Sequence, residues 1–185
     1  MKKIVAFCAA ATLFMCAAGC GQSEPEPVED EVAVEEFVIE DPNATEGELN
    51  ALASALNYLS FSAFSPNGLV DQLKYEGYTQ DEAVYAVNKC GADWNEQAVR
   101  SAQSYLSFSA FSYKGLTDQL LYEGFVPAQA NYGVENCGAD WNEQAAKSAQ
   151  QYLDMMEFSR EELLEQLKYE GFTADQAEYG VNAVY

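Results

Sequence analysis

From residue 45 onward, apolar and polar positions follow one another with the spacing of short amphipathic helices. Ala98, Ala102, Tyr105 and Leu106 stand at i, i+4, i+7 and i+8, which defines one apolar face of a helix. Asp93 precedes this face and opens a D-x-x-E pattern, which is typical of a capping box at a helix start. The pattern therefore predicts a helix that begins just after Asp93.

Two further short helices are predicted after this one. The second begins at a serine, followed by proline in residues 65–66, and ends at a glycine such as Gly124. A two-residue turn leads to the third helix. Its start is marked by a capping box in residues 79–82 and 173–176, and by Val-Pro in residues 126–127. The three helices together form a helix-turn-helix-like unit.

The whole pattern repeats with a period of 47 residues. YLSFSAFS at 58–65 returns unchanged at 105–112, and a fixed spacing over many positions is a strong repeat signal. We predict an all-α fold of three tandem repeats of three short helices. The predicted repeats cover residues 45–91, 92–138 and 139–185. Because a unit of this size has little core of its own, we expect neighbouring units to pack against each other.

The stretch CGADWNEQA occurs twice, at 90–98 and 137–145, across the predicted unit boundaries. The first unit has Gly47 at the tryptophan position, and the last unit has Val184 at the cysteine position. Tryptophan thus occurs only where a unit precedes, and cysteine only where a unit follows. We expect largely buried tryptophans to seal the junctions and the thiols to act as small apolar groups. The predicted junction residues are Cys90, Trp94, Cys137 and Trp141.

A disulfide between the two thiols of the body is an alternative for a protein outside the cell. Equivalent positions in stacked units are usually too far apart for disulfide geometry, which argues against it.

Two segments of different composition precede the repeats. Two lysines and an apolar stretch predict a lipoprotein signal peptide over 1–19, too short to be a comfortable membrane span. Its end, Ala17-Ala18-Gly19-Cys20, resembles the bacterial lipobox, so we expect a diacylglycerol anchor on Cys20; a plain secretory peptide is the alternative. Residues 21–44 hold nine Asp or Glu, three Pro and no Lys or Arg. We therefore predict a disordered acidic tether over 20–44.

Charge and composition exclude several classes of function. The net charge is −21, and residues 45–185 carry 21 acidic against 7 basic side chains, so binding to nucleic acid is not expected despite the helix-turn-helix-like units. The chain has no histidine for a Ser/His/Asp or Cys/His arrangement, and its two body cysteines are too few for a zinc site. We predict no catalytic residue, no metal, no cofactor apart from the lipid anchor and no small-molecule substrate.

Acidic side chains on the second helices are the candidate partner-binding residues, because a basic protein would be steered towards them. A solvated helix face is the alternative interpretation. These candidate residues are Asp71, Asp118, Glu161, Glu162 and Glu165.

The lipobox, the acidic tether and the repeated pattern YL…FS…L…QL.YEG[YF]…CGADWNEQA resemble the Ltp-type host-cell-surface lipoproteins. The best-understood members are encoded by prophages of Gram-positive bacteria and sit outside the membrane. The resemblance implies superinfection exclusion, in which the lipoprotein blocks phage DNA injection by engaging the phage tape measure protein. This chain has three units, whereas the phage-encoded form has two. The alternative is a chromosomal surface lipoprotein that binds cell-wall material or another surface protein and has no phage role.

Overall fold

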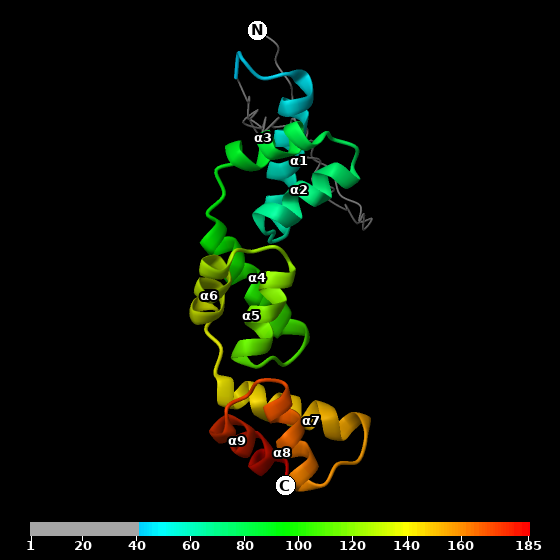
Figure 1. The fold of residues 1–185 in the computed structure, drawn as a ribbon, viewed down its shortest axis with the longest axis vertical. Coiled ribbons are helices and arrows are strands. Elements are labelled where there is room, and N and C mark those ends of the chain that lie inside the picture. Colours follow the sequence, from blue (N-terminus) through cyan, green and yellow to red (C-terminus); the bar gives the residue numbers. More distant parts are fainter. Residues whose placement is uncertain (1–40) are drawn as a thin grey trace, which may run out of the picture.

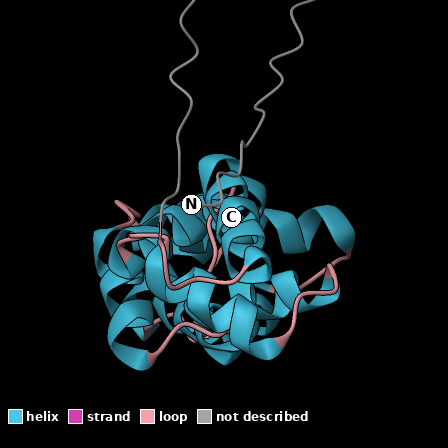
Figure 2. Ribbon diagram, turned by 90° about the horizontal axis from the view of Figure 1, so that it is seen from above, coloured by secondary structure: helices cyan, strands magenta, loops and turns pink. Residues whose placement is uncertain are grey.

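The computed structural model describes residues 41–185 of the chain. Over this range the chain forms nine α-helices and no strand (Figure 2). Three units of three helices follow one another along the long axis of an elongated molecule (Figure 1). This arrangement confirms the predicted all-α fold of three repeats. The predicted signal peptide, the lipidation residue Cys20 and the tether up to residue 40 lie outside the described residues.

Each unit contains one longer helix and two shorter ones. The first unit consists of α1 (Glu46–Phe61), α2 (Pro66–Tyr75) and α3 (Gln80–Lys89). The second consists of α4 (Trp94–Phe108), α5 (Tyr113–Tyr122) and α6 (Pro127–Asn136). The third consists of α7 (Trp141–Met155), α8 (Arg160–Tyr169) and α9 (Ala174–Val184). No helix within the described part of the chain is both long enough and apolar enough to cross a membrane.

The short helices depend on their N-terminal caps, because an isolated helix of ten residues is marginal in water. At α3, the Thr79 hydroxyl accepts a hydrogen bond from the Glu82 backbone N–H at 3.3 Å, and the Glu82 carboxylate accepts from the Thr79 N–H at 2.8 Å. This is the capping box expected from the sequence. At α6, Val126 has no side-chain acceptor, and only the Gln129 amide oxygen accepts from the Val126 N–H, at 3.2 Å.

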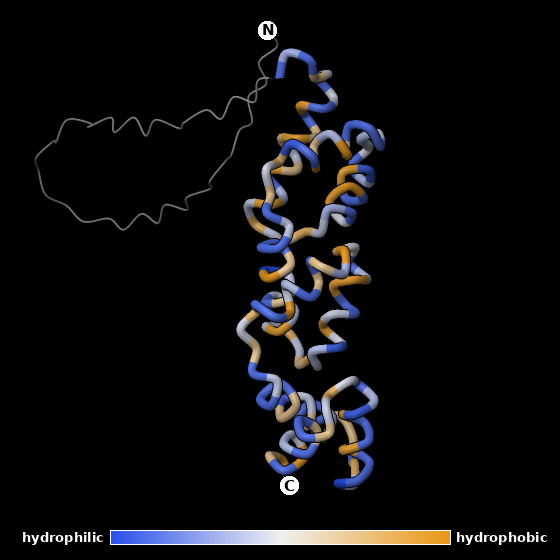
Figure 3. The backbone as a smooth tube through the Cα atoms, turned by 60° about the vertical axis from the view of Figure 1, so that its left-hand side comes forward, coloured by the Kyte–Doolittle hydropathy of each residue, from blue (hydrophilic) through white to orange (hydrophobic). Residues whose placement is uncertain are grey.

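Each unit has a hydrophobic core of its own. In the second unit, Leu116 and Leu120 of α5 are fully buried beneath α4 and α6. The crossing of α4 and α6 is close: a Cβ at Gly133 would lie 2.8 Å from Ala98. Small residues at this crossing let three short helices close around two leucines, and Figure 3 shows hydrophobic positions in all three units. The helices of each unit therefore enclose most of its own core, and the next unit adds a tryptophan at the edge of the first and second cores.

A tyrosine on the first helix of each unit joins that core to a polar network. The Tyr58 ring meets Phe64 edge-on at 5.5 Å between centroids, while its hydroxyl donates to the Glu76 carboxylate and accepts from Gln72 at 3.0 Å. The hydrogen bond to Glu76 raises the pKa of Tyr58. The same four-residue arrangement recurs around Tyr105 and Tyr152, so it fixes the first helix of every unit against the second.

Asp41, which precedes the predicted boundary at residue 45, contacts α3 of the first unit. The Asp41 carboxylate accepts from the Tyr85 hydroxyl at 2.9 Å and lies 3.7 Å from the Lys89 ammonium. Hydrogen bonds from the Asn43 N–H and from Tyr85 lower the pKa of Asp41. Residues 41–44, predicted as the end of the tether, are thus attached to α3 and belong to the first unit.

Replacing Leu120 by alanine should lower the free energy of unfolding by about 2–5 kcal/mol, because a fully buried leucine leaves a cavity. Since each unit has a separate core, we expect the loss of amide hydrogen-exchange protection to be largest in α4, α5 and α6. The matched control is Leu121→Ala at the neighbouring, partly exposed position, which should cost far less. An equal loss of protection in all three units would contradict separate cores.

The Glu82 capping box should make stability depend on pH. Hydrogen bonds from Thr79 lower the pKa of Glu82 below its ordinary value of 4.5. The ionised carboxylate therefore stabilises the folded chain above that value, and the contribution is lost as pH falls through the folded-state pKa. In Glu82→Gln the amide keeps the cap, as Gln176 does at α9, but cannot titrate.

We expect wild type to melt above the Glu82→Gln variant at neutral pH, and the gap to close as the pH falls below 4.5. Circular dichroism melting curves over a pH series measure this difference. A gap that stays constant down to strongly acidic pH would contradict the role of the ionised cap.

Candidate partner-binding surface and unit junctions

The first junction is formed by the start of α2 and the turn that follows α5. The Ser65 hydroxyl accepts from the Gly68 N–H at 2.8 Å, which caps α2, and donates to the Glu123 carbonyl of the next unit at 2.5 Å. The Asn67 side-chain amide donates to the Gly124 carbonyl at 3.2 Å. The Ser65 hydroxyl therefore both caps a helix of its own unit and joins that unit to the next.

The second junction repeats this geometry. The Ser112 hydroxyl accepts from the Gly115 N–H at 2.9 Å and donates to the Glu170 carbonyl at 2.5 Å. A Cβ at Gly171 would lie 2.9 Å from the Lys114 Cβ, so the turn after α8 lies directly against the start of α5. Gly171 has a φ of 94°, so this turn favours glycine both for its backbone and for its space.

The CGADWNEQA stretch supplies further junction contacts. Trp94 begins α4 of the second unit but packs against the core of the first. The Gln97 amide oxygen accepts from the Phe64 N–H across the junction at 3.4 Å. Trp141 packs on the second unit's core in the same way, edge-on to Tyr113 at 5.4 Å between ring centroids. Both tryptophans are half-buried within these junctions.

The two thiols are free and lie in separate cores. The Cys90 Sγ donates to the Val87 carbonyl at 3.3 Å, and the buried Cys137 Sγ donates to the Val134 carbonyl at 3.2 Å. Burial raises the pKa of the Cys90 thiol, which disfavours the reactive thiolate. Both cysteines therefore fill space at the end of a unit.

Three of the predicted partner-binding acids occupy the same position in successive units. Each lies on a second helix, is exposed and pairs with a lysine of its own helix. The pairs are Asp71–Lys74 at 3.9 Å, Asp118–Lys114 at 2.5 Å and Glu165–Lys168 at 2.9 Å. Exposed pairs of this kind contribute little to stability, so these carboxylates remain available to a partner.

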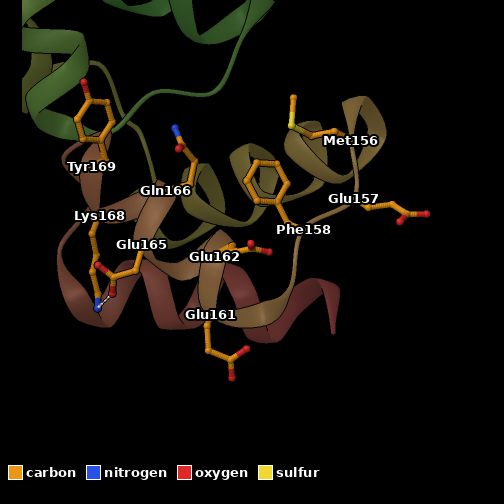
Figure 4. A pocket seen from close by; sticks show the side chains of 9 residues that line it. All are labelled: Met156, Glu157, Phe158, Glu161, Glu162, Glu165, Gln166, Lys168 and Tyr169. Atoms are coloured by element: carbon orange, nitrogen blue, oxygen red, sulfur yellow. Dashed lines mark hydrogen bonds and ion pairs between the residues drawn. The ribbon is translucent and has the colours of Figure 1, made fainter.

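The structure brings Glu161, Glu162 and Glu165 together along one groove on α8. The open groove has a volume of about 980 Å³. Figure 4 shows Met156 and Tyr169 at its opposite ends, with Phe158 between them. The remaining lining residues are Glu157, Gln166 and Lys168. Asp71 and Asp118 belong to the other units and do not line this groove. Carboxylates beside aromatic and apolar side chains suit a segment with lysine or arginine side chains.

The sequence analysis did not single out one set of exposed aromatic residues. Tyr75, Tyr122 and Tyr169, which end the second helices, are 88%, 86% and 88% exposed. Each stands four residues after the acid of its helix, so ring and carboxylate share one helix face. The helical spacing in the sequence could have predicted this exposure, because the tyrosine of each YEG does not lie on the apolar helix face that carries the buried leucines.

Sequence reasoning also missed the capping serines as junction residues. The copies differ nearby: the residue three after the serine is Gly68 or Gly115 in the first two units and Glu162 in the third. This difference between the copies marks the position, as the differences at the tryptophan and cysteine positions mark the junctions.

The fold and the exposed carboxylates define a class of protein: an all-α repeat protein with an acidic surface. In residues 41–185 no group of three or more His, Cys, Asp or Glu side chains could hold a metal ion. The model of the family described as host cell surface-exposed lipoprotein, Lipoprotein_Ltp, matches residues 48–89, 93–137 and 140–184, one match in each unit. The chain therefore belongs to this family, which is one of surface lipoproteins and not of enzymes.

One solved structure is similar to the chain. It is that of Ltp, a superinfection exclusion protein from the Streptococcus thermophilus temperate phage TP-J34. The identity is 32%, the match covers 50% of this chain and 97% of that chain, and the TM-score is 0.48. No curated protein matches the chain.

Replacing Trp94 by alanine should lower the free energy of unfolding by about 1.5–3 kcal/mol, below the 3–5 kcal/mol of a fully buried tryptophan, because its ring is half-buried. Urea unfolding followed by circular dichroism measures the loss. The control is Trp94→Phe, which keeps much of the contact with the first unit's core. A loss no larger than for an exposed residue would show that the ring does not support the junction.

Proposed function

We propose that this protein is a membrane-anchored surface lipoprotein that acts by protein–protein interaction and blocks the entry of phage DNA. Membership of the surface lipoprotein family supports the location, and the lipobox supports anchoring through diacylglycerol on Cys20. The protein would then stand on the outer face of the cytoplasmic membrane of a Gram-positive bacterium. The observation that carries the interaction is the groove that gathers three glutamates beside exposed aromatic and apolar side chains.

The chemistry of the groove favours a basic polypeptide partner. Glu161, Glu162 and Glu165 lie in a chain of net charge −21, so the field of the whole protein steers positive segments towards it. Tyr169 offers a ring face to a lysine or arginine side chain at the end of the groove. A phage tape measure protein, the partner that the family resemblance implies, would meet this surface as it arrives at the membrane.

Neutralising the groove should weaken exclusion. The variant Glu161→Gln/Glu162→Gln/Glu165→Gln keeps the α8 capping box, because glutamine fills the same role at α6 and α9. Expressed at the cell surface in a sensitive host, we expect wild type to leave phage adsorption unchanged and to reduce DNA entry. The groove variant should lose at least about tenfold of that protection, since roughly 1.4 kcal/mol of lost binding corresponds to one factor of ten.

The matched control removes the same charge elsewhere, with Asp81→Asn, Glu96→Gln and Asp175→Asn at exposed positions outside the groove. Equal losses in both variants would assign the effect to net charge rather than to the groove. DNA entry that is unchanged by wild type for every phage tried would count against a phage role and favour binding to wall material or another surface protein.

A further inference from the structure

The first and third units each carry one face that is buried in the internal junctions but uncovered at that end of the array. Inside the array, the start of α2 or α5 docks on the turn of the next unit. At the third unit no described residue docks on the equivalent start, that of α8, and Ser159 is exposed where Ser65 and Ser112 are each only 2% exposed. At the first unit the equivalent turn is uncovered by the described residues, because none of them lies within 4 Å of a Cβ built on Gly77. The described array of three units thus presents two complementary halves of one junction.

The α8 half differs from its internal equivalents at two neighbouring positions. Asn67, whose amide donates to the Gly124 carbonyl across the junction, is replaced by Glu161, which carries an acceptor instead of a donor. Gly68 is replaced by Glu162. Both changes place a carboxylate where an incoming turn would present backbone carbonyl oxygens.

Space at the second position is also limited. A Cβ on Gly68 would lie 2.9 Å from the Ser65 hydroxyl and 3.3 Å from the Glu123 carbonyl oxygen of the next unit. On Gly115 the corresponding distance to the Glu170 carbonyl oxygen is 3.6 Å. Glycine therefore gives the docking turn its closest approach. At α8, by contrast, the Glu162 carboxylate folds back to accept from the Ser159 N–H at 2.8 Å, which puts its charge at the docking face.

We propose that Glu161 and Glu162 form a stop that prevents a second copy of this chain from docking its first unit on α8. The occupant follows from the structure, because the same face of α2 and α5 is covered by a unit of this chain in both internal junctions. The free Glu76 and Gly77 turn of another molecule has the same sequence as the turn at Glu123 and Gly124. Without a stop, this head-to-tail contact does not close on itself and would build open filaments.

The test changes the start of α8 so that it carries the same docking residues as the start of α2. In a chain that starts at residue 21, and so contains all described residues and the three cores, Glu161→Asn/Glu162→Gly restores the donor and the space of Asn67 and Gly68. Sedimentation equilibrium up to about 1 mM protein detects association with a dissociation constant in the millimolar range. We expect the variant to gain mass with concentration and wild type to remain a monomer.

The control tests whether docking uses the Ser159 hydroxyl. Adding Ser159→Asp to the variant keeps a good helix cap but removes the hydroxyl proton that would donate to the incoming carbonyl. Circular dichroism should show an unchanged fold, and association should be lost. The proposal is overturned if the double variant stays monomeric at the highest concentration, if wild type associates equally, or if Ser159→Asp leaves association unchanged. Because no phage is involved, these outcomes are independent of the proposed function.

Discussion

The serine hydroxyls at the starts of α2 and α5 make the contact on which the array depends. Ser65 caps α2 and at the same time donates to the backbone of the following unit. Because the cap fixes where the hydroxyl points, the start of a helix also sets the position of the next unit. One such hydrogen bond contributes only about 0.5–1.5 kcal/mol. At the first junction it acts together with the Asn67 amide, the Gln97 side chain and the Trp94 ring, and the chain link between units raises the effective concentration of the two faces.

Separate cores explain why polar contacts can have this role. Leu116 and Leu120 are already enclosed by the second unit's own helices, as their equivalents are in the other two units. Little apolar surface therefore remains for the junctions, where Trp94 and Trp141 are each half-buried. The units resemble closed modules joined by hydrogen bonds more than layers of one continuous core.

Local signals in the sequence predicted the helices well because each one has its own start and stop. The serine and threonine caps, the glycine after each second helix and the 47-residue period are all contained in short stretches. What could not be derived was how a helix start meets a turn 58 residues away, since no local pattern encodes the direction of a hydroxyl. The exposure of Tyr75 was missed for a related reason: an aromatic residue repeated in every unit is easily taken for core. Only Glu161, Glu162 and Glu165 of the candidate acids meet in one groove, and that depends on how α8 packs.

The contacts of Asp41 with α3 determine which part of the first unit bears a mechanical force applied to the chain from its N-terminal side. A force from the N-terminal side reaches the Asp41 contacts with Tyr85 and Lys89 before it reaches the backbone of α1. Through these contacts the force is transmitted to α3, which packs against both other helices of the first unit. A force between the two ends of the body then passes through each junction in turn. The three units therefore behave as mechanical elements in series, in which a junction can yield and re-form while every core stays closed.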